Sequence, residues 1–425
     1  MDKSISNIEK IIYTELLLII LLIFNQSTFR SQIIIIFASF LNLRLIIKFY
    51  RITPLLIFFL FSFSYILPFF YFFFYDISVS AHEAFNNSYY LGLVIDIYCL
   101  FLLSIFIFSK TSRNYVFIRQ RLTFHFSSKK YYFLLIIILI LVIIGLKGQS
   151  LLSGDYGSIV KIQSPLYEYT LIFLSIAVLY VGKSKFKRNL LLGIILIIIG
   201  KALLYGGRVT SVEVILLSYI LLFEDRIPKK WILAFLTVGF IFMRIFVVIR
   251  SNPILFLSGD FTFIDFFRLT NSHQLSSNQG DVAQASARII GLIKVGILST
   301  GERVSSLFYS ILSVVTPGVS FSNLSNLASF KQNIYSSGGG GLFPVYFFAW
   351  LSYLGVFFAG YIVSKIINTF ITTRNNYYLL FTALVMSTFP RWLAYNPIVM
   401  VKLCFYVIPI YYLLNHVKFS LKKET

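Results

Sequence analysis

The chain has 425 residues, of which 58% are hydrophobic, 18% are aromatic and only 12% are charged. This balance, with a mean hydropathy of +0.83, excludes a soluble domain. Apolar runs of spanning length repeat along the chain, and they predict an all-α polytopic membrane protein. The net charge of +21 does not predict a nucleic-acid partner, because most Lys and Arg residues lie in short loops between the runs, where they set the orientation of the spans.

Apolar runs predict about twelve transmembrane helices. In chain order they are 11–25, 31–48, 53–74, 91–109, 131–146, 167–182, 189–205, 209–223, 231–249, 342–364, 377–391 and 397–415. Several are shorter than the roughly 20 residues that a bilayer needs, so we expect these helices to extend into their flanks. No small-residue cleavage pattern follows the first run, which predicts an uncleaved first span. Cys99 and Cys404 lie inside apolar runs and predict neither a disulfide framework nor a zinc site.

Basic residues are concentrated in alternate loops of this topology. The basic loops are 44–51, 110–130, 183–188, 224–230 and the tail 416–425. The opposite loops, such as 76–90 and 152–165, are poor in Lys and Arg. The positive-inside rule therefore predicts that both termini are cytoplasmic.

One long segment, 251–341, separates the ninth and tenth runs on the predicted outer side. We treat the whole chain, 1–425, as a single membrane domain that contains this large outer loop. The loop includes two predicted amphipathic helices, 281–296, with Asp281 as its N-cap, and 301–315. The apolar face of the second suits a helix that lies on the bilayer or caps the bundle. The loop ends in SSGGGG, which permits close approach of the backbone.

Several cations lie at or near the predicted outer ends of spans, where the positive-inside rule does not place them. They are Lys201, Arg208, Arg244, Arg250, Arg391 and Lys402. A charge at the bilayer centre costs roughly 3 kcal/mol, so such residues are kept where they face a cavity, pair or bind a ligand. Arginine offers planar bidentate donors, and the set predicts a phosphate or pyrophosphate site. Each residue taken alone is explained as well by interfacial anchoring.

Lys201 and Glu213 flank the Gly206–Gly207 turn at nearly equal depth. They can pair across the hairpin, which would leave Arg208 available for a ligand. Alternatively, each residue snorkels or bonds a neighbouring span separately. Asp96, inside the fourth run, is expected to pair with a basic residue on a neighbouring span.

The layout of about twelve spans, the GGR turn at 206–208, the arginines ending the ninth span and the large outer loop resemble the O-antigen polymerase (Wzy-like) family. The resemblance implies an enzyme of the bacterial inner membrane that polymerises undecaprenyl-diphosphate-linked oligosaccharides into O-antigen or capsular polysaccharide. It also implies contact with membrane lipids and with a chain-length regulator protein. The related lipid A-core ligases carry a histidine near the end of the loop, whereas residues 333–350 contain no histidine and no carboxylate.

Glycosyl transfer from such a carrier releases a diphosphate, whose charge must be stabilised. We predict a metal-independent site without a cofactor, in which Arg208, Arg250 and Arg244 bind the diphosphate, with Arg391 and Lys402 as further candidates. The acceptor hydroxyl also needs a general base. The catalytic candidates are His273, Glu302 and Asp265, with Asp260 and Asp281 behind them. Glu302 follows Gly301 at a helix start, where an acidic residue is also favoured by the helix dipole.

Three other functions fit the composition. A lipid-linked oligosaccharide flippase has many spans and a cationic interior, but generally short loops. A polyprenyl-phosphate-sugar glycosyltransferase would carry an acidic motif in the first outer loop, which here is NQSTFR (25–30). A signalling or structural membrane protein is the third. His82 and Glu83, in another outer loop, could contact sugar or belong to a plain loop.

Overall fold

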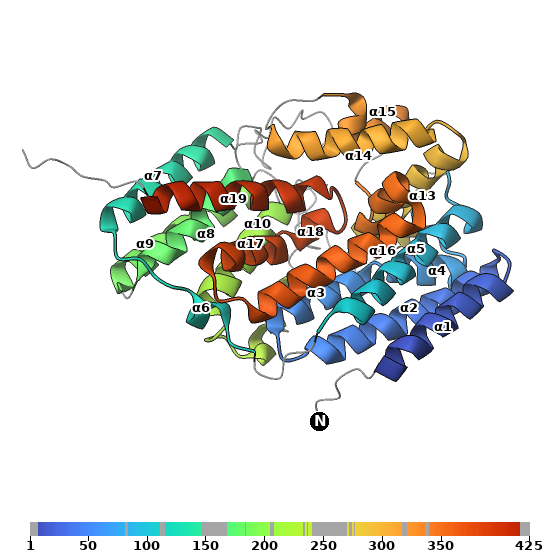
Figure 1. Cartoon of the computed structure of the whole chain (residues 1–425), viewed down its shortest axis with the longest axis horizontal. Helices are drawn as coiled ribbons and strands as arrows, with labels where there is room; N and C mark the ends of the chain where they lie inside the picture. The colour runs from blue at the N-terminus through green and yellow to red at the C-terminus, as the bar shows by residue number, and fades with distance from the viewer. Residues whose placement is uncertain are drawn as a thin grey trace, which may run out of the picture. The chain divides into compact units, whose positions relative to one another are not determined.

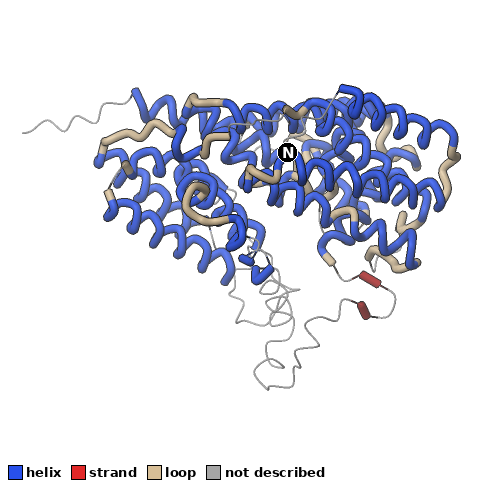
Figure 2. Tube along the Cα trace, turned by 90° about the horizontal axis from the view of Figure 1, so that it is seen from below, coloured by secondary structure: helices blue, strands red, loops and turns tan. Residues whose placement is uncertain are grey.

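The structure is a computed structural model that describes 7–80, 84–110, 115–145, 168–182, 184–204, 208–232, 234–235, 237–239, 270–271, 274–275, 277–316, 321–335 and 340–416. Nearly all of these residues are helical (Figure 2). Within the described ranges the only strands are β1 (Thr270–Asn271) and β2 (Gln274–Leu275), which pair antiparallel. The predicted all-α class is therefore confirmed.

The chain divides into two compact units, which are described separately. Unit 1 comprises Met1–Tyr115, Leu269–Thr372 and Phe389–Val401, and unit 2 comprises Val116–Arg268, Thr373–Thr388 and Lys402–Thr425. The single membrane domain expected over 1–425 stays a prediction.

Unit 1 is built around helix α5 (Ser88–Phe108), which is mostly apolar apart from Asp96 and almost wholly buried, as expected for a helix at the centre of a bundle. Helix α5 packs against α16, α2 and α13 (Figure 1). The helices of this unit are α1 (Asn7–Ile23), α2 (Thr28–Phe49), α3 (Thr53–Ser64), α4 (Leu67–Tyr75), α5, α13 (Asn278–Lys294), α14 (Thr300–Val315), η5 (Asn323–Ser325), α15 (Leu327–Ile334), α16 (Phe343–Thr372) and α18 (Phe389–Trp392).

Unit 2 has the buried helix α8 (Thr170–Val181) at its centre, packed against α7 and α17. Its other helices are α6 (Ile118–Arg121), α7 (Ser128–Gly145), α9 (Lys185–Leu204), α10 (Arg208–Ser218), η3 (Tyr219–Phe223), α17 (Asn376–Ser387) and most of α19 (Ile398–His416).

Five helical segments among the described residues are long and apolar enough to cross a membrane. They are Thr28–Phe49, Thr53–Tyr75, Ser88–Phe108, Ser128–Gly145 and Phe343–Thr372. Three shorter apolar helices are Thr170–Val181, Val209–Phe223 and Asn376–Ser387. Every predicted run falls on a described helix except 231–249, which lies mostly outside the described residues. The protein is thus a membrane protein, and the count of twelve spans stays a prediction.

The two helices predicted in the large loop are confirmed as α13 and α14. The predicted N-cap of the first was wrong, because Ser277 caps α13 by accepting a bond from the amide of Gly280 at 3.1 Å. Asp281 lies within the first turn, where its carboxylate accepts a hydrogen bond from Ser80 Oγ at 3.1 Å. Local propensity allowed the helix to start one turn earlier, since the polar residues between Ser277 and Asp281 can occupy a first turn as readily as a loop.

Helix α16 is broken near its start. Leu351 and Ser352 leave the helical conformation, and Ser352 has φ 57° and ψ −149°, a region that costs a non-glycine residue about 1–3 kcal/mol. A glycine follows the break, and a Cβ at Gly355 would lie 2.0 Å from the carbonyl oxygen of Phe347. The part after the break, 353–372, is still long enough at about 1.5 Å per residue to cross the hydrocarbon core.

Candidate functional site

Many of the predicted site residues lie outside the described residues, and for one of them only the backbone is described. Outside them are the catalytic candidates His273 and Asp265, the diphosphate candidates Arg244 and Arg250, and also Asp260, His82 and Glu83. Arg208 is the first residue of α10, and its side chain is not described. Their predicted roles therefore stay predictions.

The remaining diphosphate candidates belong to different units. Arg391 lies in the last turn of the short helix α18 in unit 1 and is half-buried. Lys402 belongs to α19 in unit 2, where its Nζ lies 5.9 Å from the centroid of the Tyr169 ring, within the range of a cation–π contact. Arg391 and Lys402 are the two diphosphate candidates whose side chains are described, and the grouping of all five in one site stays a prediction.

The predicted Lys201–Glu213 pair lies on two helices, α9 and α10, that pack together in unit 2. Lys201 Nζ donates a hydrogen bond to the carbonyl oxygen of Val142 on α7 at 2.7 Å. Glu213 is buried. The bond to Val142 agrees with the alternative in which Lys201 bonds a neighbouring helix, and the pair itself stays a prediction.

Glu302 forms a capping box at the start of α14. Its carboxylate accepts bonds from the amide of Ser299 at 2.7 Å and from Ser299 Oγ at 2.8 Å, while Ser299 Oγ accepts from the amide of Glu302. These hydrogen bonds from the Ser299 side chain and backbone lower the pKa of Glu302. A general base needs a pKa nearer neutrality, so the geometry favours the capping role.

Two buried cations that sequence reasoning did not select meet in unit 1. Arg288 on α13 is only 3% exposed, and its Nη1 donates to the carbonyl oxygen of Tyr335 at 3.1 Å. Its guanidinium carbon lies 5.7 Å from the Tyr335 ring centroid. Lys331 on α15 is fully buried, and its Nζ donates to the carbonyl oxygen of Gly340 at 3.0 Å. We call Arg288 and Lys331 the buried cation pair.

The electrostatics of the buried cation pair favour an anion. Burial, and then the charge of Arg288, lower the pKa of Lys331 to about 7. Burial also lowers the pKa of Arg288, and its Nε is buried without a hydrogen-bond partner among the described residues. Two like charges that are shielded from water repel each other. A dianionic group would relieve that repulsion and would also accept a hydrogen bond from Arg288 Nε. A phosphate or diphosphate has this chemistry.

Glycines at the end of the loop bring the backbone to Lys331. A Cβ at Gly340 would lie 1.8 Å from the carbonyl oxygen of Tyr395, and one at Gly341 would lie 2.9 Å from Ile289 Cδ1. The next amide, that of Leu342, donates to Ser286 Oγ on α13 at 2.8 Å. The segment therefore runs in close contact with α13 on one side and with the chain after α18 on the other. The close approach expected of the glycine-rich end is confirmed at these two residues.

Gly340→Ala is expected to lower the free energy of unfolding by about 3 kcal/mol, at the upper end of overpacking effects, because the added methyl meets backbone that has no rotamer to change. The matched control is Gly301→Ala, since nothing lies within 4 Å of the added methyl there. Thermal unfolding of both variants in the same detergent measures the difference. Equal midpoints would contradict this description of the glycine segment.

One feature of the sequence could have identified Arg288 as a candidate functional residue. It is the only charge in the run ASARIIGLI, whose other residues are small or apolar, and a lone charge on a helix that is otherwise buried is expected to have a function or a partner. Lys331 has no comparable feature, because its segment LASFKQNI has the pattern of an ordinary short amphipathic helix.

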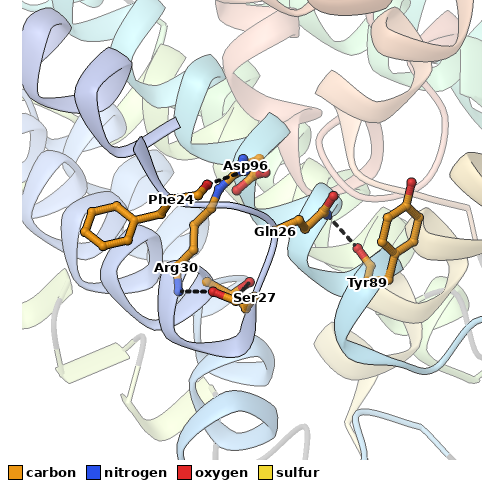
Figure 3. A network of polar contacts seen from close by, with 7 residues as sticks. Phe24, Gln26, Ser27, Arg30, Tyr89 and Asp96 are labelled. Carbon is orange, nitrogen blue, oxygen red and sulfur yellow. Dashed lines mark hydrogen bonds and ion pairs between the residues drawn. The ribbon is translucent and has the colours of Figure 1, made fainter. Parts of the chain in front are cut away.

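A buried ion pair joins α2 to α5 in unit 1 (Figure 3). Arg30 Nη2 lies 2.5 Å from Asp96 Oδ2, and Arg30 Nη1 donates to the carbonyl oxygen of Phe24 at 3.3 Å. Beside it, the Gln26 amide donates to the carbonyl oxygen of Tyr89 at 3.0 Å. The expectation that Asp96 pairs with a basic residue of a neighbouring span is confirmed. The two opposite charges of this pair cancel, so the pair does not predict an anion site.

No family model, no curated protein and no solved structure matches the chain. Among the described residues, no group of three or more His, Cys, Asp or Glu side chains could hold a metal ion. The metal-independent site stays a prediction, and the functional interpretation depends on the chemistry of the buried cation pair.

Proposed function

We propose that the protein is a membrane glycosyltransferase that polymerises polyprenyl-diphosphate-linked oligosaccharide repeat units into O-antigen or capsular polysaccharide at the outer face of the bacterial inner membrane. The observation that carries the proposal is the buried cation pair, Arg288 and Lys331, within the long segment 251–341 of a membrane protein. In the predicted orientation this segment lies outside the cytoplasm, where flipped lipid-linked repeat units are found.

The buried cation pair suits the leaving group of this reaction. The acceptor hydroxyl oxygen attacks the anomeric carbon of the growing chain, the bond from that carbon to the diphosphate oxygen breaks, and the diphosphate leaves with the electron pair. The hydroxyl proton passes to a base, for which His273, Asp265 and Asp260 stay the candidates. Fixed cations stabilise charge that develops on the leaving diphosphate, and they do so most strongly where water is excluded. Arg208, Arg244, Arg250, Arg391 and Lys402 are proposed to bind the rest of the carrier head group.

The test uses the full chain in vesicles with a synthetic polyprenyl-diphosphate oligosaccharide. A ladder of longer glycans on a gel supports the polymerase. Movement of the substrate across the bilayer without new linkages would instead identify the alternative, a lipid-linked oligosaccharide flippase. Absence of both activities with a substrate of matching sugars would contradict the two functions together.

The affinity of the buried cation pair for an anion is expected to fall as the pH rises through about 7. The pKa of Lys331 in the ligand-free protein is lowered to about 7, so the amine is charged below that pH and neutral above it. A bound anion favours the charged form, and binding at pH 8 should therefore take up a proton, with affinity falling by up to about tenfold per pH unit. Titration calorimetry with inorganic pyrophosphate in two buffers of different ionisation enthalpy measures this uptake. Lys331→Met should abolish it, and a pH-independent affinity in the parent protein would refute the assignment.

A further inference from the structure

Helix α14 turns the side chain of Arg303 toward the protein. Arg303 Nε donates to the carbonyl oxygen of Ala349 at 2.5 Å, and Arg303 Nη2 donates to that of Phe348 at 3.1 Å. These carbonyls lie just before the break in α16, where the regular ladder of helix hydrogen bonds is interrupted. The guanidinium of α14 thus supplies donors to the broken helix, and its charge is turned away from the outer surface of α14.

Two serines continue this protein-facing side of α14. Ser306 Oγ accepts a bond from Trp350 Nε1 at 3.1 Å and donates to the carbonyl oxygen of Leu324 at 2.8 Å. Ser310, one turn further along, donates to the carbonyl oxygen of Ser325 at 2.9 Å. The side of α14 that carries Arg303, Ser306 and Ser310 therefore packs against other elements of the protein. In a water-soluble protein, the polar side of such a helix would be exposed to solvent.

The apolar side of α14 is exposed instead. Val304, Phe308 and Ile311 follow one another at spacings of four and three residues, so they form one stripe along the helix. All three are more than half exposed, and the Phe308 side chain is 59% exposed. We call these three residues the α14 stripe. A polar edge flanks it, because Ser305 is also exposed and Tyr309 is half-exposed.

The α14 stripe adjoins a surface of a membrane span. Helix α14 packs on α16, and two exposed leucines lie at the break in α16 and just after it, Leu351 and Leu354, of which Leu354 is 82% exposed. Helix α16 is one of the five segments able to cross a membrane. Exposed leucines on such a span are expected to face acyl chains, and α14 lies at the edge of the same unit (Figure 1).

We propose that the α14 stripe is a lipid contact surface, which inserts among acyl chains at the boundary of the bilayer. An interfacial helix normally divides into a lipid side and a water side. Helix α14 has three sides: the stripe toward lipid, the edge at Ser305 toward head groups and water, and the side at Arg303 toward α16. This arrangement satisfies the charge of Arg303 within the protein and leaves no polar side chain in the stripe. The proposal does not depend on the polymerase function.

The test places a spin label at the stripe and at its polar edge. Phe308→Cys and, as a matched control one turn away, Ser305→Cys are labelled in the full chain and reconstituted into vesicles of phosphatidylethanolamine and phosphatidylglycerol. The parent chain gives the background, because Cys99 and Cys404 are both buried. Collision with oxygen, which concentrates in acyl chains, is compared with collision with a water-soluble nickel chelate. Ile311→Cys is the second stripe variant if Phe308→Cys does not fold.

The proposal predicts an oxygen-to-nickel collision ratio several-fold higher at 308 and 311 than at 305. Equal nickel access at all three positions would place the stripe in water and overturn the proposal. Protection of the stripe from both reagents would also overturn it, because that result shows a protein partner or a second copy of the chain on this face.

Discussion

Arg288→Gln is expected to reduce chain extension by about 10²- to 10³-fold while leaving the thermal stability unchanged or raised. The loss follows from removing a fixed cation at the leaving diphosphate. The Arg288 guanidinium is buried, repels Lys331 and has an Nε without a hydrogen-bond partner among the described residues. Removing this charge is therefore expected to leave the free energy of unfolding of the ligand-free protein unchanged or to raise it. The opposite movement of activity and stability is the signature of a residue kept for function.

Lys294→Gln is the matched control, since Lys294 lies on the same helix α13 and is exposed. It should keep both the glycan ladder and the unfolding midpoint of the parent protein. If Arg288→Gln still makes full-length polymer, the assignment of the diphosphate to the buried cation pair is wrong. If activity and stability fall together, Arg288 is a structural residue, and the proposal for this pair fails in that case too.

Asp96→Asn is expected to lower the free energy of unfolding by about 3–5 kcal/mol, because it leaves the Arg30 guanidinium without its counter-charge in a buried place. Replacement of both residues by apolar ones, Arg30→Met with Asp96→Leu, should recover most of this loss, since no charge is then buried. Thermal unfolding of the single and double variants in one detergent measures the difference. A double variant no more stable than Asp96→Asn would show that the charges contribute more than they cost.

The control for this experiment is a second ion pair of unit 1, between Arg44 and Glu9, whose side chains are each 25% exposed. Glu9→Gln should cost about 1 kcal/mol or less, because solvent screens a partly exposed pair. Similar losses for Glu9→Gln and Asp96→Asn would mean that burial does not set the contribution of the Arg30–Asp96 pair.

Local features of the fold were predictable because they depend on neighbours in the chain. The helices at 281–296 and 301–315 follow from apolar spacing, and both are found within a few residues of the expected bounds. The alternative that Glu302 caps a helix also needs only the preceding turn, and the capping box with Ser299 bears it out. The N-cap of α13 was wrong because several polar residues in a row can each begin a helix.

The buried cation pair was not predictable, because its burial depends on contacts distant in sequence. Arg288 and Lys331 meet only once α13 packs against α15, and Lys331 reaches Gly340 only because the glycine segment passes close to Tyr395. A periodic pattern tells which face of a helix is apolar. It does not tell whether a neighbouring element covers a polar side chain, and on α14 Ser306 and Ser310 are covered in this way.

By itself, the sequence determined that this is an all-helical membrane protein with ordered helices in its longest loop, because hydropathy and helical periodicity are properties of short windows. It also led us to expect a basic partner for Asp96, a charge inside an apolar run. Only the tertiary structure decided that the partner is Arg30, and that Arg288 and Lys331 share one buried place. Pairing of distant residues is set by packing and desolvation, which no window of neighbouring residues contains.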